Sequence, residues 1–387
     1  MALSNPPVPM VYMITSLSMG GAQKVLLQLL DSDLRRGFRP VCIVILRRVS
    51  GLESQFSELG IPLIYLEFEK PWRTPGKITE IIRMLKNNRV RFLYSVMHHA
   101  NLFSVFLKWL CGRNLSLIWS IHDTPLENLY TRPDHRFFLW LTQKLSGVPK
   151  SIVVVSVRSR QRYIQLNYPA TKLNLIPNGV PVRQHDRNVL AAARRELRAE
   201  LGLGADAVLI GSLTRYVTEK DIPCMLEAFS LFQQTEKEAF LVLAGEGIEE
   251  ENSELSVLLD ELAIADSVFL LGIRSDAEKI LRGLDIATLS SRSEALPLFI
   301  AEAMGEGVPV VATSVGDIPL LLGDTGELVA PENPSALKNG WQKILALSGA
   351  ERWAIVESAR HRVASEFSVA SMVDKHRQLF ENSYDNG

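Results

Sequence analysis

Two glutamates eight residues apart are the first candidates for chemistry in this chain. Glu294 lies in a polar stretch, and Glu302 lies within the segment of strong helix formers that follows it. Eight residues is a little over two helical turns, so both carboxylates could border one ligand site. The predicted helix start, where backbone amides attract anionic groups, is formed by Ala295, Leu296, Pro297 and Leu298. Taken alone, such a pair more often belongs to the solvated face of an amphipathic helix.

Two cations, Arg215 and Lys220, lie five residues apart in a polar loop. The loop follows an apolar run, residues 207–213, that is typical of a buried strand, and it precedes a predicted helix. Arginine and lysine at such a place suit a pyrophosphate, because both side chains bind phosphate oxygens. Solvated loop cations are the plainer alternative. Together with the glutamates, the loop predicts a ligand that carries both hydroxyl and phosphate groups.

The elements that must position these residues follow the pattern of an α/β protein. Apolar runs at residues 10–16 and 207–213 each lead through a polar loop into a helix, so each half of the chain opens in the same way. The glutamates lie between two further predicted strands, at residues 285–290 and 308–312. A chain of 387 residues is too long for one ordinary core. We therefore predict two Rossmann-like domains that face each other across a cleft, with ligands at the carboxyl ends of parallel strands.

Charge is distributed unequally along the chain. Residues 1–185 contain 24 Lys and Arg against 10 Asp and Glu, whereas residues 186–387 contain 18 against 33. A basic half indicates an anionic partner, such as a membrane surface, a diphosphate-linked acceptor or nucleic acid. Attraction between the two halves is the alternative. From this basic half we expect contact with an anionic membrane. No nucleic-acid recognition motif is visible, so we expect no nucleic-acid partner.

Composition also bears on the cellular compartment. Cys42, Cys111 and Cys224 lack metal-ligand spacing and fit the reduced thiols of a cytosolic protein. No apolar run is long enough to span a bilayer, and residues 8–16 read as a first strand rather than a signal peptide. We expect a cytoplasmic protein that binds peripherally at the inner face of the membrane. The aromatic-rich segment at residues 137–145 is predicted as a core helix rather than a membrane-docking one.

The sequence around the glutamates carries a family resemblance. Residues 291–316 read S-x-x-E-x-L-P-L-x-x-x-E-A-M-x-x-G-x-P-V-V-A-T-x-x-G, which resembles the donor-sugar motif of retaining glycosyltransferases of family 4, with the GT-B fold. The loop at residues 215–221, R-x-x-x-E-K-D, resembles the family signature R-L-x-x-x-K-G. The resemblance implies an N-terminal acceptor-binding domain at residues 1–184 and a donor-binding domain at residues 185–366. It also implies that a terminal helix at about residues 367–387 crosses back to the first domain.

The resemblance assigns roles to individual residues. It implies that Glu302 binds the ribose of a nucleotide-sugar donor, UDP- or GDP-linked, and that Glu294 grips the transferred sugar. Arg215 and Lys220 would stabilise the departing diphosphate. His122, at the end of another predicted strand, would contact the sugar when the domains close.

Four further residues are implied as donor contacts. Gly20 and Gly21 lie in the first strand-to-helix turn, where glycine allows close approach of the backbone to a ligand. Gly245 lies in a loop similar to the family's A-G-x-G-P, and Arg274 lies where the family's backbone meets the nucleobase. The full G-x-G-x-x-G fingerprint is absent, so no NAD site is predicted. One departure is Ala295, which replaces the family's usual glycine and could restrict sugar choice or turnover.

The function that the resemblance implies is enzymatic. It is the transfer of a sugar to a glycan or lipid-linked acceptor hydroxyl in the biosynthesis of cell-surface polysaccharide or lipopolysaccharide. No cofactor and no metal are expected, since two cations can neutralise the diphosphate. Two alternatives stay open: a catalytically weak or inactive scaffold protein of the same fold, and a nucleotide-sugar epimerase.

Overall fold

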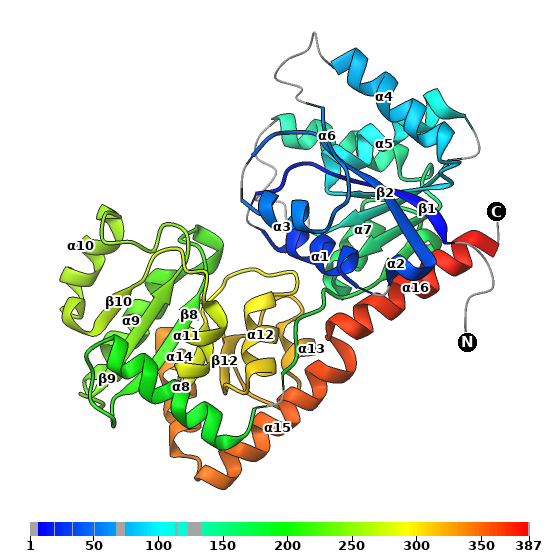
Figure 1. Ribbon diagram of the computed structural model, residues 1–387. Coiled ribbons are helices and arrows are strands. Elements are labelled where there is room, and N and C mark those ends of the chain that lie inside the picture. Colours follow the sequence, from blue (N-terminus) through cyan, green and yellow to red (C-terminus); the bar gives the residue numbers. More distant parts are fainter. Residues whose placement is uncertain are drawn as a thin grey trace. The chain divides into compact units, whose positions relative to one another are not determined.

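A computed structural model describes residues 7–18, 20–32, 34–49, 51–66, 74–112, 115–122, 133–183 and 185–385 of the chain (Figure 1). The chain divides into two units. The first comprises Met1–Gly179 together with Val369–Gly387, and the second comprises Val180–Ser368. Gln184, at which the sequence predicts the end of the N-terminal domain, lies outside the described residues.

The first unit is built on a seven-stranded sheet of parallel neighbours in the order β3-β2-β1-β4-β5-β6-β7. Its strands are Val8–Ile14 (β1), Phe38–Ile45 (β2), Leu63–Tyr65 (β3), Phe92–Val96 (β4), Ser116–Ile121 (β5), Ser151–Val154 (β6) and Leu173–Leu175 (β7). Its helices are Gly21–Leu30 (α1), Leu34–Gly37 (α2), Glu53–Glu58 (α3), Thr74–Asn87 (α4), His98–Cys111 (α5), Pro133–Leu145 (α6), Val157–Gln165 (α7), the short Ala170–Lys172 (η2) and Val369–Asp385 (α16).

Both faces of this sheet are buried, as the central strand β1 shows. Met10, Tyr12 and Ile14 belong to one apolar cluster. Val11 and Met13, which point to the opposite face, belong to another. A parallel strand covered on both faces is apolar at every position, which is why short unbroken apolar runs predict these strands.

The second unit repeats this plan with a six-stranded sheet of parallel neighbours in the order β10-β9-β8-β11-β12-β13. Its strands are Val208–Leu213 (β8), Ala239–Ala244 (β9), Val268–Leu270 (β10), Ile286–Leu289 (β11), Val310–Thr313 (β12) and Glu327–Val329 (β13). Its helices are Arg187–Glu200 (α8), Thr218–Lys220 (η3), Ile222–Gln233 (α9), Ser253–Glu261 (α10), Ala265–Ser267 (η4), Ala277–Gly283 (α11), Leu298–Glu306 (α12), Ile318–Leu322 (α13), Pro334–Ala346 (α14) and Gly349–Glu366 (α15).

Each sheet has one point at which the strand order changes direction. In the first sheet this point lies between β1 and β4, and in the second it lies between β8 and β11. Open α/β sheets bind ligands beyond the carboxyl ends of their strands at such a point. The prediction of two Rossmann-like domains is confirmed, and the point between β8 and β11 is where a ligand of the second unit is expected.

The last helix of the chain, α16, completes the core of the first unit. Phe380 packs edge to face against Phe38, with ring centroids 5.2 Å apart. The hydroxyl of Tyr94 lies 3.0 Å from Nε2 of His376. Burial lowers the pKa of His376 to about 4, so its imidazole is neutral at neutral pH and serves as a core hydrogen-bonding group.

Helix α6 differs from its predicted role. Phe137 and Trp140 stack on each other with ring centroids 5.9 Å apart, but their exposed fractions are 55% and 50%. The prediction of a core helix is therefore wrong for these two residues, which lie three apart in the helix and are about half exposed. Within the described parts, no helix combines the length and the apolar character that a membrane span requires.

Candidate active site

Lys220 and Glu294 meet beyond the carboxyl ends of two neighbouring strands. Strand β8 ends at Leu213 and strand β11 ends at Leu289, and the two strands pair where the strand order of the second sheet changes direction. Nζ of Lys220 lies 2.5 Å from Oε1 of Glu294, and the Ser291 hydroxyl donates to the same oxygen over 2.6 Å. The Glu294 side chain is only 10% exposed, so this contact fixes both groups more firmly than a surface ion pair would.

The two loops that carry these side chains are also joined directly. The Ser290 hydroxyl donates to the carbonyl oxygens of Lys220 and Asp221, which lie 2.8 and 2.9 Å away. The backbone N–H of Arg292 donates to the carbonyl of Glu219 over 2.9 Å. The guanidinium of Arg292 lies 3.0 Å from the carboxylate of Asp221. These contacts hold the functional groups in place before a ligand arrives, which is what preorganisation requires.

Asp221 occupies the position at which the family signature has glycine. Its backbone has a φ of 49°, in the left-handed region, at the N-cap of α9. Glycine adopts this conformation at least cost, and aspartate is among the few other residues that tolerate it. Asp221 thus adopts a conformation that glycine favours, and it adds a carboxylate that binds Arg292.

Two glycines allow neighbouring loops to approach each other closely. Gly245, which follows β9, has a φ of 142°, and a Cβ atom there would overlap the carbonyl oxygen of Thr214. Its N–H donates to the carbonyl of Gly272 over 2.7 Å. Gly316, which follows β12, has a φ of 58°, and a Cβ atom there would overlap the carbonyl oxygen of Glu294. The structure thus places the predicted residue Gly245 against the loop that leads to Lys220.

Helix α12 carries Glu302 and begins at the predicted anion site. Its N-cap residue is Pro297, whose side chain cannot accept a hydrogen bond, so no side chain of that residue caps the first-turn amides. The loop before it is fixed because the N–H of Asp317 donates to the carbonyl of Ala295 over 3.0 Å. Leu296 is buried and Glu302 is half-buried. The helix start is therefore rigid and suited to an anionic group.

The two predicted arginines of the second unit differ in their surroundings. Arg215 is exposed and forms no ion pair with any residue that the structure describes. Arg274 binds the carboxylates of Asp276 and Glu200 through Nη2, at 2.6 and 2.9 Å. Hydrogen bonds to these two carboxylates raise the pKa of Arg274. Its guanidinium is therefore already engaged, whereas that of Arg215 is open to a ligand.

The predicted residues of the first unit lie beyond the carboxyl ends of β1 and β5. Gly20 is the N-cap of α1, and Gly21 is its first residue. A Cβ atom on Gly20 would lie 2.6 Å from Oε1 of Gln23, the end of a flexible side chain that could move away. His122 directly follows β5, and its Nε2 lies 2.9 Å from the hydroxyl oxygen of Ser120.

Three residues that shape the site are absent from the sequence-based prediction. Ser291 lies three residues before Glu294, and the S-x-x-E spacing of the motif was its signal. Asp221 and Arg292 lie 71 residues apart in sequence, so no local pattern could reveal their ion pair. In the described part of the chain, no group of three His, Cys, Asp or Glu side chains is arranged to hold a metal ion.

Two family models match the chain. The model of Glycosyltransferase Family 4 matches residues 19–184, and the model of Glycosyl transferases group 1 matches residues 193–362. Together they span most of both units. The chain belongs to these glycosyltransferases. The family resemblance of the Glu294–Glu302 segment is thereby confirmed, and the protein is a transferase.

Curated relatives of this glycosyltransferase are distant in sequence. It is 24% identical over 310 residues to N-acetyl-alpha-D-glucosaminyl L-malate synthase of Bacillus anthracis, covering 79% of this chain and 77% of that protein. It is 27% identical over 184 residues to LpsE of Rhizobium meliloti, a lipopolysaccharide core biosynthesis glycosyltransferase, covering 47% of this chain and 52% of that protein.

Solved structures share the fold of this glycosyltransferase. Alr3699/HepE of Anabaena in complex with UDP has a TM-score of 0.81 at 18% identity, covering 97% of this chain and 100% of that one. The same protein is also known in complex with UDP-glucose. At this level of identity the likeness concerns the fold, and it confirms the GT-B assignment.

Proposed function

We propose that this glycosyltransferase transfers a sugar from a nucleoside diphosphate sugar to an acceptor hydroxyl, with retention of the anomeric configuration. The observation that carries the proposal is the contact of Lys220 with Glu294 at the direction change of the second sheet. A carboxylate that binds the sugar and a cation that receives the departing diphosphate must lie close to the same breaking bond. Lys220 and Glu294 meet this requirement.

The leaving diphosphate gains negative charge as the bond to the sugar breaks. Lys220, the exposed Arg215 and the amides at the start of α12 are assigned to stabilise that charge. Glu302, in the second turn of α12, is assigned to the ribose hydroxyls. His122 is assigned to the transferred sugar, as its family position implies.

The donor and the acceptor are proposed from the similar proteins. HepE was solved with UDP and with UDP-glucose, so a UDP-sugar is the first candidate donor. LpsE is a glycosyltransferase of lipopolysaccharide core biosynthesis, so a glycan or lipid-linked acceptor in cell-surface glycan assembly is the first candidate acceptor. No metal is required in this proposal, because cations and helix amides supply the positive charge.

Nucleotide binding is the direct test of the donor site. UDP at about 100 times its dissociation constant is expected to stabilise the protein by about 2.7 kcal/mol, measured as a shift in thermal unfolding. Glu302→Ala is expected to abolish the shift, because the ribose loses its carboxylate. Glu261→Ala, which removes an exposed glutamate from α10 of the same unit, is the matched control and should retain the shift.

Other outcomes of this titration would redirect the proposal. A shift with NAD and with no nucleoside diphosphate would contradict a sugar donor. A shift with UDP but neither transfer nor hydrolysis of UDP-sugars would indicate a scaffold protein. Conversion of a UDP-sugar into its epimer without transfer would indicate an epimerase.

We also propose that the first unit binds an anionic membrane at the cytoplasmic face, through α5 and α6. Trp109 on α5 is 67% exposed, and it adds to the exposed pair Phe137 and Trp140 on α6. On α6, Arg136 and Lys144 are both exposed and lie four residues on either side of Trp140, so cations and an indole share one face. Exposed tryptophans flanked by cations are typical of helices that lie in a membrane interface.

Removing both indoles tests this membrane contact. The double variant Trp109→Ala/Trp140→Ala is expected to bind vesicles of anionic lipid at least about tenfold more weakly in co-sedimentation at low salt, because two large apolar side chains no longer leave water. Ile273→Ala is the matched control, since Ile273 is 65% exposed but belongs to the second unit. Equal retention of all three proteins would contradict the proposed surface.

A further inference from the structure

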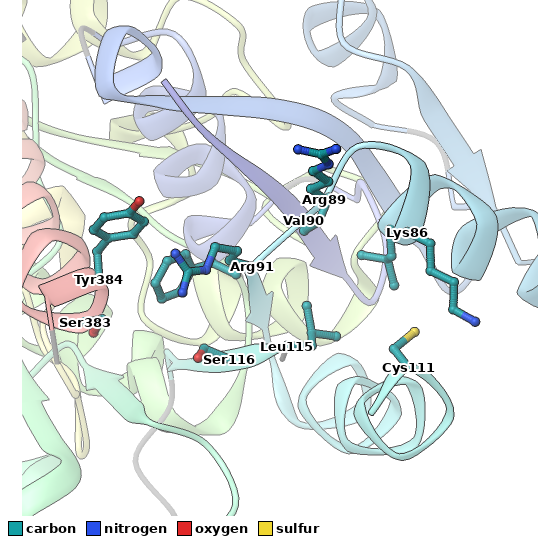
Figure 2. A pocket seen from close by; sticks show the side chains of 11 residues that line it. Lys86, Arg89, Val90, Arg91, Cys111, Leu115, Ser116, Ser383 and Tyr384 are labelled. Atoms are coloured by element: carbon teal, nitrogen blue, oxygen red, sulfur yellow. The ribbon is translucent and has the colours of Figure 1, made fainter. Parts of the chain in front are cut away.

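A pocket of the first unit lies at the amino ends of its strands, opposite the carboxyl ends that Gly20, Gly21 and His122 follow. It has a volume of about 620 Å³ and is formed where β4 and β5 begin and where α4, α5 and α16 end. Figure 2 shows the side chains around it, with Ser383 and Tyr384 of α16 on one side and Lys86 and Cys111 on the other. Small-molecule sites commonly have volumes in this range.

The rim of this pocket is cationic. Lys86, Arg89 and Arg91 line it, and no aspartate or glutamate does. All three are exposed, and none forms an ion pair with a residue that the structure describes. The guanidinium carbon of Arg91 lies 5.1 Å from the centroid of the Tyr384 ring, so a cation–π contact orients this arginine along the pocket wall.

Arg89 occupies a backbone position that favours glycine. Its φ is 51°, and it follows the C-terminus of α4. The N–H of Arg89 donates to the carbonyl of Lys86, and the N–H of Val90 donates to that of Leu85, which is the Schellman arrangement. The helix dipole favours a cation near this end, and the same turn is formed by Asn167 and Ala263 at other helix ends of the chain. This capped turn fixes the backbone that carries the exposed Arg89 side chain at the pocket.

This pocket lies at the other end of the strands from His122, the residue of the first unit that is assigned to the transferred sugar. Phe92 and Ser116, which line the pocket, are the first residues of β4 and β5. His122 follows the other end of β5. Because β4 has five residues and β5 has six, the two ends of these strands are roughly 16–20 Å apart at about 3.3 Å per residue.

We propose that this pocket binds a small soluble polyanion that carries two or more phosphate groups. The three cations are spread along the rim in Figure 2 rather than directed at one point, so a single phosphate would reach only some of them. Arginine binds phosphate through two parallel hydrogen bonds, which suits recognition of several phosphate oxygens. Leu85, Val90 and Leu115 form an apolar part of the lining that a sugar or base attached to the phosphates would cover. This inference does not depend on the donor proposed for the second unit.

The experiment is calorimetric titration of the full chain with pyrophosphate and tripolyphosphate. Arg89→Gly is expected to weaken binding of tripolyphosphate at least tenfold while leaving the melting temperature unchanged or higher, since glycine suits a φ of 51°. Arg91→Gln is expected to weaken binding as well. Arg83→Gln removes another exposed arginine of α4 that does not line the pocket, and it should bind as the unchanged protein does.

The donor site also has cations, so the double variant Arg215→Gln/Lys220→Gln separates the two sites. Tripolyphosphate binding that persists in this variant and is lost in Arg89→Gly supports the pocket. Binding that is lost in the double variant and kept in Arg89→Gly overturns it. Equal weakening by Arg83→Gln would show general charge attraction and would also overturn it. The proposal is also overturned if soluble polyphosphates do not bind the unchanged protein while Arg89→Gly reduces its binding to anionic vesicles.

Discussion

Lys220→Ala is expected to lower kcat/KM for sugar transfer by about 100- to 1,000-fold, the usual effect of removing one preorganised group that stabilises developing charge. The ammonium of Lys220, which belongs to the loop that follows β8, lies beside the carboxylate proposed to hold the sugar. Without it, the departing diphosphate keeps Arg215 and the helix amides but loses its partly buried cation. The measurement is the initial rate of transfer from the donor that the nucleotide titration identifies.

Two further variants separate catalysis from folding in this experiment. Lys220→Ala also leaves the carboxylate of Glu294 without its cation at a side chain that is only 10% exposed, which destabilises the site. The double variant Lys220→Ala/Glu294→Gln removes that unpaired charge, so its melting temperature should recover while its activity stays low. Lys237→Ala, an exposed lysine of the same unit, should remain fully active. A Lys220→Ala rate within twofold of the unchanged protein would contradict the proposed role.

The fold could be predicted because its local signals are strong. Strands such as β1 and β8 are unbroken apolar runs followed by a polar loop and a helix, and this order leaves few alternatives to a parallel sheet. The approach of Lys220 to Glu294 rests on the same signals. Each follows a predicted strand, and the structure shows that the two strands are neighbours.

The surroundings of Arg274 could not be predicted in this way. Its partner Glu200 lies 74 residues earlier in the chain, and nothing near either residue indicates their ion pair. The exposure of Trp140 could not be predicted from the sequence for a different reason. An aromatic-rich helix is equally apolar whether it enters the core or faces outward, and only the packing of α6 decides which side chains are covered.

Gly316→Ala is expected to destabilise the second unit by about 2–4 kcal/mol, because alanine is strained at a φ of 58° and its Cβ would overlap the carbonyl of Glu294. That carbonyl belongs to the residue that contacts Lys220, so we expect relief of the overlap to move the Glu294 backbone. A displacement near 1 Å at a reacting group costs on the order of 100-fold in rate. Urea unfolding and the transfer rate measure the two effects.

The control for this prediction is Gly349→Ala, at the first position of α15. A Cβ atom there has no neighbour within 4 Å, and the backbone is not in the left-handed region, so alanine should leave stability unchanged or slightly higher. Gly316→Ala with unchanged stability would show that the overlap is relieved elsewhere, and unchanged activity would remove the structural argument that this glycine positions Glu294. Loss of activity with the nucleotide-induced thermal shift intact is the expected signature, because it places the damage at the sugar end of the donor rather than at the ribose that Glu302 is proposed to hold.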